Sequence, residues 1–142
     1  MQAVIGQEFP KEIIPLIEKA RHTIKVVVFF WGWYGNEPAN PCQLFNSAMC
    51  RAVKRGVTVR ACVNSEKVAK PLRANGIDTR IPISKNLMHT KMILIDDEVL
   101  VLGSHNFSQS AFTTNLETSI IAKNDEAMPR FVQFFDSIWS LQ

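Results

Sequence analysis

The sequence predicts an α/β fold, with a mixed, largely parallel β-sheet and helices on both faces. Three observations point to this class. Strand and helix patterns alternate through the first half of the 142-residue chain, which favours parallel strands joined by helical crossovers. Residues 26–31 form an uninterrupted apolar run, typical of a central strand covered on both faces. Two later apolar runs, residues 92–95 and 99–102, flank an acidic turn and predict a hairpin.

Apolar residues recur at helical spacing near the N-terminus and predict a first helix over roughly residues 9–21. Pro10 suits a first helical position. Pro15 conflicts with a straight helix, because an interior proline loses a backbone hydrogen bond and clashes with the preceding turn. We therefore expect a kink at Pro15 or a helix that begins nearer Ile14.

Residues 24–31 are rich in β-branched and aromatic side chains and predict the central strand, which a Gly-, Asn- and Pro-rich loop follows. Trp31, Trp33 and Tyr34 cluster where this strand ends. Two interpretations of the cluster stay open. The rings can stack on nucleobases or touch lipid, or they can pack in the core or at an interface. We prefer the packing interpretation.

The remaining elements continue the alternation of strands and helices. In order, they are a helix over residues 44–53 that stops at Gly56, a strand over 57–63, a helix over 66–75 that Gly76 closes, a strand over 77–81, the hairpin, a strand over 117–123 and a helix over 128–139. No internal repeat or linker is visible. We therefore assign residues 1–142 to a single domain.

Composition excludes several classes of protein. No uninterrupted apolar run approaches the roughly 20 residues that span a bilayer. No signal peptide is visible, so we expect a cytoplasmic protein, with export to the periplasm as the alternative if a leader was removed. Cys42, Cys50 and Cys62 have neither the number for a disulfide framework nor the spacing of a zinc site. We expect buried small side chains there, and neither a metal nor a cofactor.

The net charge of +3 conceals an asymmetry along the chain. Residues 51–91 contain ten basic and two acidic side chains, whereas residues 92–142 contain two basic and seven acidic ones. A polyanionic substrate that passes near the basic middle is one explanation, because Lys and Arg contacts to phosphates supply much of nucleic-acid affinity. Charges dispersed over solvated helix faces are the other.

Polar side chains stand at the outer ends of the predicted hairpin. His89 and Lys91 precede its first strand, and Ser104 and Asn106 follow its second. Antiparallel pairing brings both groups to the same edge of the sheet. A histidine can attack phosphorus or transfer protons, while a lysine and an amide can stabilise charge on phosphoryl oxygens. The residues therefore favour a phosphate-centred reaction, in which a carboxylate such as Glu117 could hold one ring nitrogen.

The spacing of these residues resembles the HKD signature of the phospholipase D superfamily. The matching positions are His89-x-Lys91-x-x-x-x-Asp96, then Gly103-Ser104-x-Asn106, then Asn115-x-Glu117. The resemblance implies a phospholipase D-like α-β-α sandwich and extends more weakly over the whole chain. A single HKD copy in a chain of this length is similar to the Nuc-type endonucleases, which form a homodimer across the active site. It therefore implies a twofold dimer.

The resemblance also implies roles for individual residues. His89 of one subunit would attack the phosphodiester to give a phosphohistidine, while His89 of the other protonates the leaving oxygen. Lys91, Ser104 and Asn106 would hold the phosphoryl oxygens, and Glu117 would orient His89. Asp96 matches the family's aspartate but lies at the far end of its strand, so we expect a supporting role. His105 occupies a variable position, where it could point into the sheet or toward the site.

The leading functional hypothesis is a metal-independent phosphodiesterase or endonuclease that cleaves DNA or RNA as a homodimer. A lipid phosphodiesterase that hydrolyses cardiolipin is the alternative, because it would use the same residues on a membrane lipid. A non-catalytic nucleic-acid-binding module is a third hypothesis, which the intact set of four residues His89, Lys91, Asn106 and Glu117 disfavours.

Overall fold

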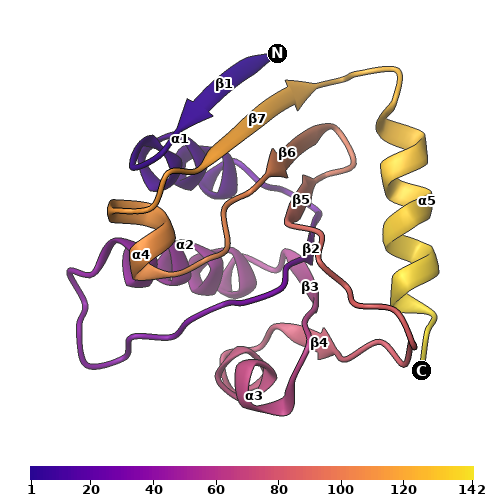
Figure 1. Ribbon diagram of the computed structural model, residues 1–142, viewed down its shortest axis with the longest axis horizontal. Helices are drawn as coiled ribbons and strands as arrows, with labels where there is room; N and C mark the ends of the chain where they lie inside the picture. The colour runs from indigo at the N-terminus through magenta and orange to yellow at the C-terminus, as the bar shows by residue number, and fades with distance from the viewer.

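The computed structural model describes residues 1–142 and contains one seven-stranded mixed sheet with five helices (Figure 1). The strand order is β1-β7-β6-β5-β2-β3-β4. The strands are β1 (Gln2–Ile5), β2 (Thr23–Val27), β3 (Thr58–Cys62), β4 (Asp78–Arg80), β5 (Met92–Ile95), β6 (Val99–Gly103) and β7 (Thr118–Lys123). The helices are α1 (Glu8–Glu18), α2 (Pro41–Lys54), α3 (Glu66–Ala74), α4 (Gln109–Thr113) and α5 (Met128–Trp139). None of them is long and apolar enough to cross a membrane.

The α/β class and the mixed sheet are confirmed, but the prediction of a largely parallel sheet is wrong. Only β2–β3 and β3–β4 pair in parallel, and the other four pairings are antiparallel. The reason lies in residues 81–91. They stay on the side of the sheet at which β4 ends, and they contain no helix to return the chain to the side at which β4 begins. β5 therefore starts on the side where β4 ends and runs against β2, and the β5–β6 hairpin and β7 continue the antiparallel pattern.

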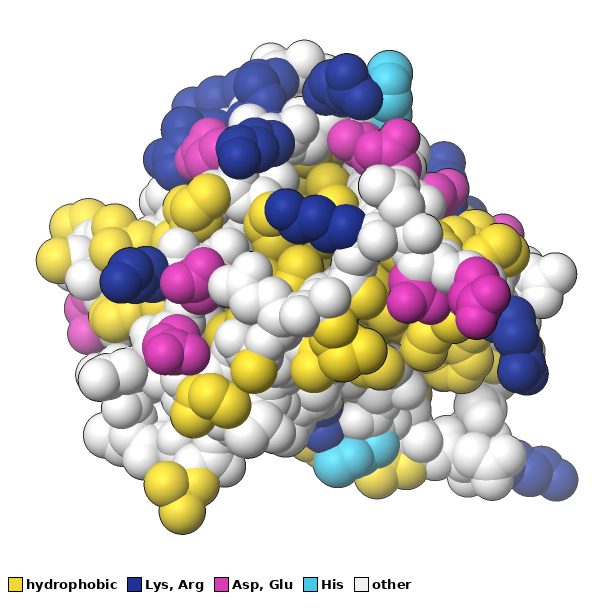
Figure 2. All heavy atoms as spheres, turned by 90° about the horizontal axis from the view of Figure 1, so that it is seen from above, with side chains coloured by type: hydrophobic (Ala, Val, Ile, Leu, Met, Phe, Trp, Pro, Cys, Tyr) yellow, Lys and Arg dark blue, Asp and Glu magenta, His cyan; other side chains and the backbone are white.

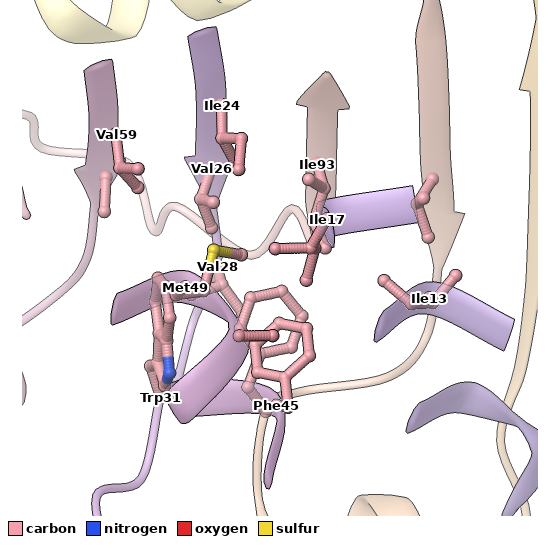
Figure 3. Close-up of a cluster of buried hydrophobic side chains, with 14 of the residues drawn as sticks. Ile13, Ile17, Ile24, Val26, Val28, Trp31, Phe45, Met49, Val59 and Ile93 are labelled. Carbon is pink, nitrogen blue, oxygen red and sulfur yellow. The ribbon is translucent and has the colours of Figure 1, made fainter. Parts of the chain in front are cut away.

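Helices cover both faces of the sheet, as predicted. α1, α2 and α4 lie on one face and α5 on the other (Figure 1). Successive residues of β2 alternate between the two layers. Val26 and Val28 belong to a cluster of 29 buried residues under α1 and α2, whereas Val27 packs in a smaller cluster under α5. Figure 3 shows Phe45 and Met49 of α2 packed toward Val26 of β2 and Val28, the residue that follows the strand.

The first helix begins where it was predicted, within one residue, but ends earlier than predicted. α1 runs from Glu8 to Glu18 and continues through Pro15, so it does not begin near Ile14. Pro15 and Lys11 are both exposed, so water can satisfy the Lys11 carbonyl that the proline leaves without its usual partner. An interior proline is tolerated here because it lies on the solvent side of the helix.

Two elements were not predicted because they are short and carry little pattern. β1 has four residues, of which only Val4 is buried, so no alternation marks it as a strand. It pairs with β7 at the sheet edge. α4 has five residues and begins after Ser108, whose hydroxyl accepts a hydrogen bond from the Ala111 amide.

The position of Trp31 decides between the two interpretations of the aromatic cluster for this one residue. Its side chain is 1% exposed, and its indole N–H donates to Asn46 Oδ1 at 2.6 Å. Packing is therefore confirmed for Trp31, which cannot stack on a ligand. Trp33 and Tyr34 are only half-buried. They retain faces that solvent reaches.

The three cysteines are free. Cys42 and Cys62 are buried, as expected, and burial raises the pKa of each thiol to about 12. Cys50 is half-buried, and burial also raises its pKa, against the opposing effect of Lys54 and Arg51. None of the three is an activated thiolate.

Candidate active site

Five of the six candidate site residues lie at one edge of the sheet. β2, β3 and β6 end at this edge, and β5 and β7 begin there. The register pairs Met92 with Leu102 and Gly103 with Ser119. This pairing sets the residues before β5, after β6 and before β7 beside one another, as the hairpin prediction required. They are His89, Lys91, Ser104, Asn106 and Glu117.

His89 and Lys91 form the first half of the site. Lys91 Nζ lies 3.2 Å from each ring nitrogen of His89 and donates to the His89 carbonyl at 3.0 Å. The Phe29 ring lies 5.3 Å from the imidazole, centroid to centroid. His89 is nevertheless exposed, so its ring is open to a ligand. Burial lowers the pKa of Lys91, and the negative charge of Glu117 opposes that shift.

Ser104 and Glu117 form the second half. Ser104 Oγ donates to Glu117 Oε1 at 2.6 Å and accepts from the Thr118 amide at 3.0 Å. Asn115 Nδ2 donates to Glu117 Oε2 at 3.1 Å. Glu117 makes no hydrogen bond to His89, so the expected Glu117–His89 pair is not formed in this chain. The carboxylate is instead held by Ser104 after β6 and Asn115 before β7, close enough for its charge to act on Lys91.

Asn106 presents a free donor at the same edge. Its Oδ1 accepts from the Phe30 amide at 3.2 Å, while its Nδ2 makes no hydrogen bond within the chain. The Phe30 carbonyl accepts from the Phe107 amide at 3.1 Å. These two bonds tie the exits of β2 and β6 together and fix the orientation of the amide. Asn106 Nδ2 is therefore available for an anionic oxygen.

Asp96 does not join the site, because it lies at the opposite edge of the sheet. Its backbone has a φ of 53°, and its carboxylate accepts from the amides of Arg21, His22 and Thr23 at 2.7–2.9 Å. Burial tends to raise the pKa of this carboxyl, but the three backbone hydrogen bonds outweigh it and the pKa is lowered. Asp96 thus anchors the start of β2 to the β5–β6 turn.

His105 points away from the site into the layer under α1. It is 1% exposed, its Nδ1 lies 2.7 Å from Ser119 Oγ, and its Nε2 lies 2.8 Å from the Gly6 carbonyl. The Phe9 ring packs against it at 4.5 Å. Burial lowers the pKa of His105, although the hydrogen bond to Gly6 and the charge of Glu117 act the other way. A buried position explains why it cannot reach a substrate.

Two further residues shape the site, and neither was among the six candidate site residues. Asn64 follows β3, and its Nδ2 donates to the Phe29 carbonyl at 3.2 Å and to the Met88 carbonyl at 3.0 Å. Its place directly after a predicted strand was the only sequence signal. Gly103 ends β6, where a Cβ atom would lie 2.3 Å from the Thr118 carbonyl oxygen. The glycine permits the close approach of β6 and β7 that lets Ser104 reach Glu117.

A groove of about 750 Å³ opens beside His89, between residues 81–90 and α5. Asn64, Lys85 and Asn86 contribute polar groups to it, and Met88 and Phe134 contribute apolar ones. A second groove of about 560 Å³ continues from it along α5 and shares Thr90 and Phe134 with it. The second groove is mainly apolar. Together the grooves give a substrate access to the imidazole.

The ten basic side chains of residues 51–91 differ in whether another side chain holds them. Five of its ten basic side chains are held by acidic or aromatic partners, namely Arg51, Arg55, Arg60, Arg73 and Arg80. Its five lysines make no ion pair. On the face drawn in Figure 2, basic side chains gather at one edge with acidic ones among them. The charges therefore form no single continuous stripe, but Lys67 and Lys85 line grooves at the site edge.

Comparison with known proteins places this geometry in context. The family model described as cardiolipin synthase, PLD-like domain, matches residues 13–139. Mitochondrial cardiolipin hydrolase from Homo sapiens is 33% identical over 92 residues, which cover 61% of this chain and 36% of that protein. Phospholipase D from Rickettsia prowazekii is 30% identical over 129 residues, which cover 87% of this chain and 58% of that protein. The chain thus spans only part of the length of either relative.

Among solved structures, the fold is similar to that of Nuc from Salmonella typhimurium, described as a phospholipase D family member. The TM-score is 0.83 at 20% sequence identity, and the match covers 99% of this chain and 93% of that one. At this identity the likeness concerns the fold alone.

Proposed function

Because this chain belongs to the phospholipase D-like domain family, we propose that it is a phosphodiesterase that cleaves DNA or RNA through a phosphohistidine at His89. One observation carries the proposal. An exposed imidazole, the Lys91 ammonium and the free amide donor of Asn106 lie at one edge of the sheet, beside a groove. These are a nucleophile and two stabilisers of phosphoryl charge.

The chemistry follows from the free groups at this edge. A ring nitrogen of His89 attacks phosphorus, and a nitrogen–phosphorus bond forms as the bond to the leaving oxygen breaks. Lys91 and Asn106 hold the non-bridging oxygens, whose charge they stabilise. The leaving oxygen takes a proton from a second imidazolium. Water then attacks the phosphohistidine, gives its proton to that second imidazole, and frees His89.

The second imidazole comes, in this proposal, from another copy of the chain. The other two histidines are elsewhere, since His22 is at the edge where β2 begins and His105 is buried. Exposed apolar side chains flank the site, with Leu87 69% and Leu116 102% exposed. A twofold contact across this edge would cover them and set the two copies of His89 face to face. The proposed enzyme is therefore a homodimer with a shared active site.

Nucleic acid is the preferred substrate because of the charge near the site. Lys67 and Lys85 line the flanking grooves without acidic partners, and Lys91 stands at the imidazole. Cations in this arrangement suit a chain of phosphates better than a single headgroup.

A lipid phosphodiesterase is the second candidate, because the groove along α5 is mainly apolar. The groove along α5 is lined by Met92, Leu102, Phe131 and Phe134, and Arg130 also lines it. Such a surface suits an acyl chain next to a phosphate. The similarity to a mitochondrial cardiolipin hydrolase points the same way. A non-catalytic nucleic-acid-binding module remains the third hypothesis, which predicts binding without cleavage.

One experiment separates the three. The protein is incubated with labelled single-stranded DNA, duplex DNA, RNA and cardiolipin vesicles, each with excess EDTA. We expect cleavage of nucleic acid by the wild type and by the matched control His22→Ala, and none by His89→Ala. Cleavage that EDTA abolishes contradicts the metal-independent phosphohistidine. If only cardiolipin is cleaved, the substrate is a lipid and the second candidate is correct. If nucleic acid is bound but no product forms, the third hypothesis is favoured.

A further inference from the structure

We propose that the groove between residues 30–34 and α3 binds a nucleobase of a single-stranded polynucleotide, next to the phosphate that His89 attacks. The proposal rests on the proposed function and names its substrate class. The groove has a volume of about 420 Å³, and residues from both elements line it. It lies on the side of the site away from the groove along α5.

One wall of this base groove is aromatic. It consists of Phe30, which is 40% exposed, and the half-buried Trp33 and Tyr34. Tyr34 is fixed in place, since its hydroxyl accepts from the Gln109 amide at 3.1 Å and its ring lies close over Gly32. Fixed aromatic faces next to open space are the feature on which bases stack, and every base offers a π-face.

The other wall carries a cation. Lys67 of α3 lines the groove and makes no ion pair. An ammonium that lines the same groove as aromatic rings suits a base with its attached phosphate. An acyl chain would leave Lys67 without a partner, whereas the phosphate of a nucleotide supplies one. The charge therefore favours a nucleotide.

The base groove is joined to the site through Phe30. Phe30 contributes its ring to the groove, and its backbone amide donates to Asn106 Oδ1 at 3.2 Å. A base on Phe30 thus lies beside a phosphate held by Asn106. A paired base has both faces occupied by its neighbours in the helix, so the groove selects for a single strand.

The test compares binding of two probes by fluorescence anisotropy, in the His89→Ala background and with EDTA so that neither is cleaved. One probe is a short single-stranded DNA, and the other is an abasic strand of the same length. We expect the DNA to bind about tenfold more tightly, as one stacked base contributes. Phe30→Leu removes this preference, and Phe30→Tyr keeps it. Lys67→Gln weakens the binding of both probes by the same factor, while the control Lys54→Gln changes the affinity for neither probe.

The outcomes separate this inference from the proposed function. If Phe30→Leu keeps the preference for DNA over the abasic strand, the base groove is wrong, even if the enzyme with intact His89 still cleaves DNA. If that enzyme cleaves neither DNA nor RNA while the preference for DNA over the abasic strand holds, the proposed function fails, the neighbouring phosphate is not attacked, and only base binding in the groove stands. The same variants are also mixed with cardiolipin vesicles. Vesicle binding that Phe30→Leu abolishes, with no preference for bases, would assign the groove to a lipid chain and overturn the inference.

Discussion

The Asn64 side chain donates a hydrogen bond to the backbone carbonyl of Met88 at 3.0 Å, one residue before His89. The same amide donates to the Phe29 carbonyl at 3.2 Å. Phe29 in turn packs against the imidazole. Asn64 therefore holds both the chain segment that carries His89 and the ring beside it, without touching the imidazole itself. It is a positioning residue for the proposed nucleophile.

We predict that Asn64→Ala lowers kcat by about 10- to 100-fold with little change in KM, because an imidazole displaced by about 1 Å attacks poorly. Asn75→Ala is the matched control, since Asn75 also donates its amide to a backbone carbonyl but lies at the end of α3. Steady-state kinetics and circular dichroism of both variants provide the test. Equal losses of activity in the two variants would show that only general stability was affected.

We predict that Gly103→Ala lowers the free energy of unfolding by about 1–3 kcal/mol, as overpacking does, and also impairs activity. The added Cβ would lie 2.3 Å from Ser119 Oγ and from the Thr118 carbonyl oxygen, so β6 and β7 must separate. Gly35→Ala is the control, because a Cβ at Gly35 has no neighbour within 4 Å. Urea denaturation measures the free energy of unfolding of the two variants. An unchanged midpoint for Gly103→Ala would contradict the close approach of the strands.

We predict that Asp96→Asn lowers stability by about 2 kcal/mol, since charge-assisted hydrogen bonds to three amides are weakened. Asparagine tolerates the positive φ of 53°, so the backbone is kept. The pKa of Asp96 is lowered on folding, so its contribution is complete above its ordinary value of 3.8 and is lost as pH falls below it. The exposed Asp136→Asn is the control in denaturation at pH 7 and pH 3. Activity per folded molecule should be retained.

We predict that His105 makes the protein less stable in mild acid. Burial lowers its pKa, so below the ordinary value of 6.5 the unfolded chain binds a proton that the folded chain resists. The stabilising contribution is complete above pH 6.5 and declines as pH falls from there toward the lowered value. His105→Gln removes this decline, although it weakens the fold at pH 8 through imperfect bonds to Ser119 and Gly6. Urea titrations from pH 8 to pH 5, with the exposed His22→Gln as control, measure the difference.

The sequence predicted the parts of the fold that follow from local pattern. The hairpin placed His89 and Lys91 beside Ser104, because an antiparallel turn brings chain ends together whatever else surrounds it. The direction of β5 relative to β2 was not predictable, because it depends on residues 81–91, which carry no periodic signal. The hydrogen-bond partners of Glu117 were not predictable either, because they depend on which donor lies nearest to the carboxylate in the folded chain. In this chain that donor is Ser104.

In the proposed enzyme one active site needs His89 from two copies of the chain, and mixed dimers measure this dependence. Wild-type and His89→Ala chains carrying different affinity tags are co-expressed, and the mixed dimer is purified through both tags. The shared-site account predicts at least an about 100-fold loss in the mixed dimer, because either the nucleophile or the general acid is missing. Activity near half that of the wild-type dimer, or a fully active monomer in light scattering, would contradict it.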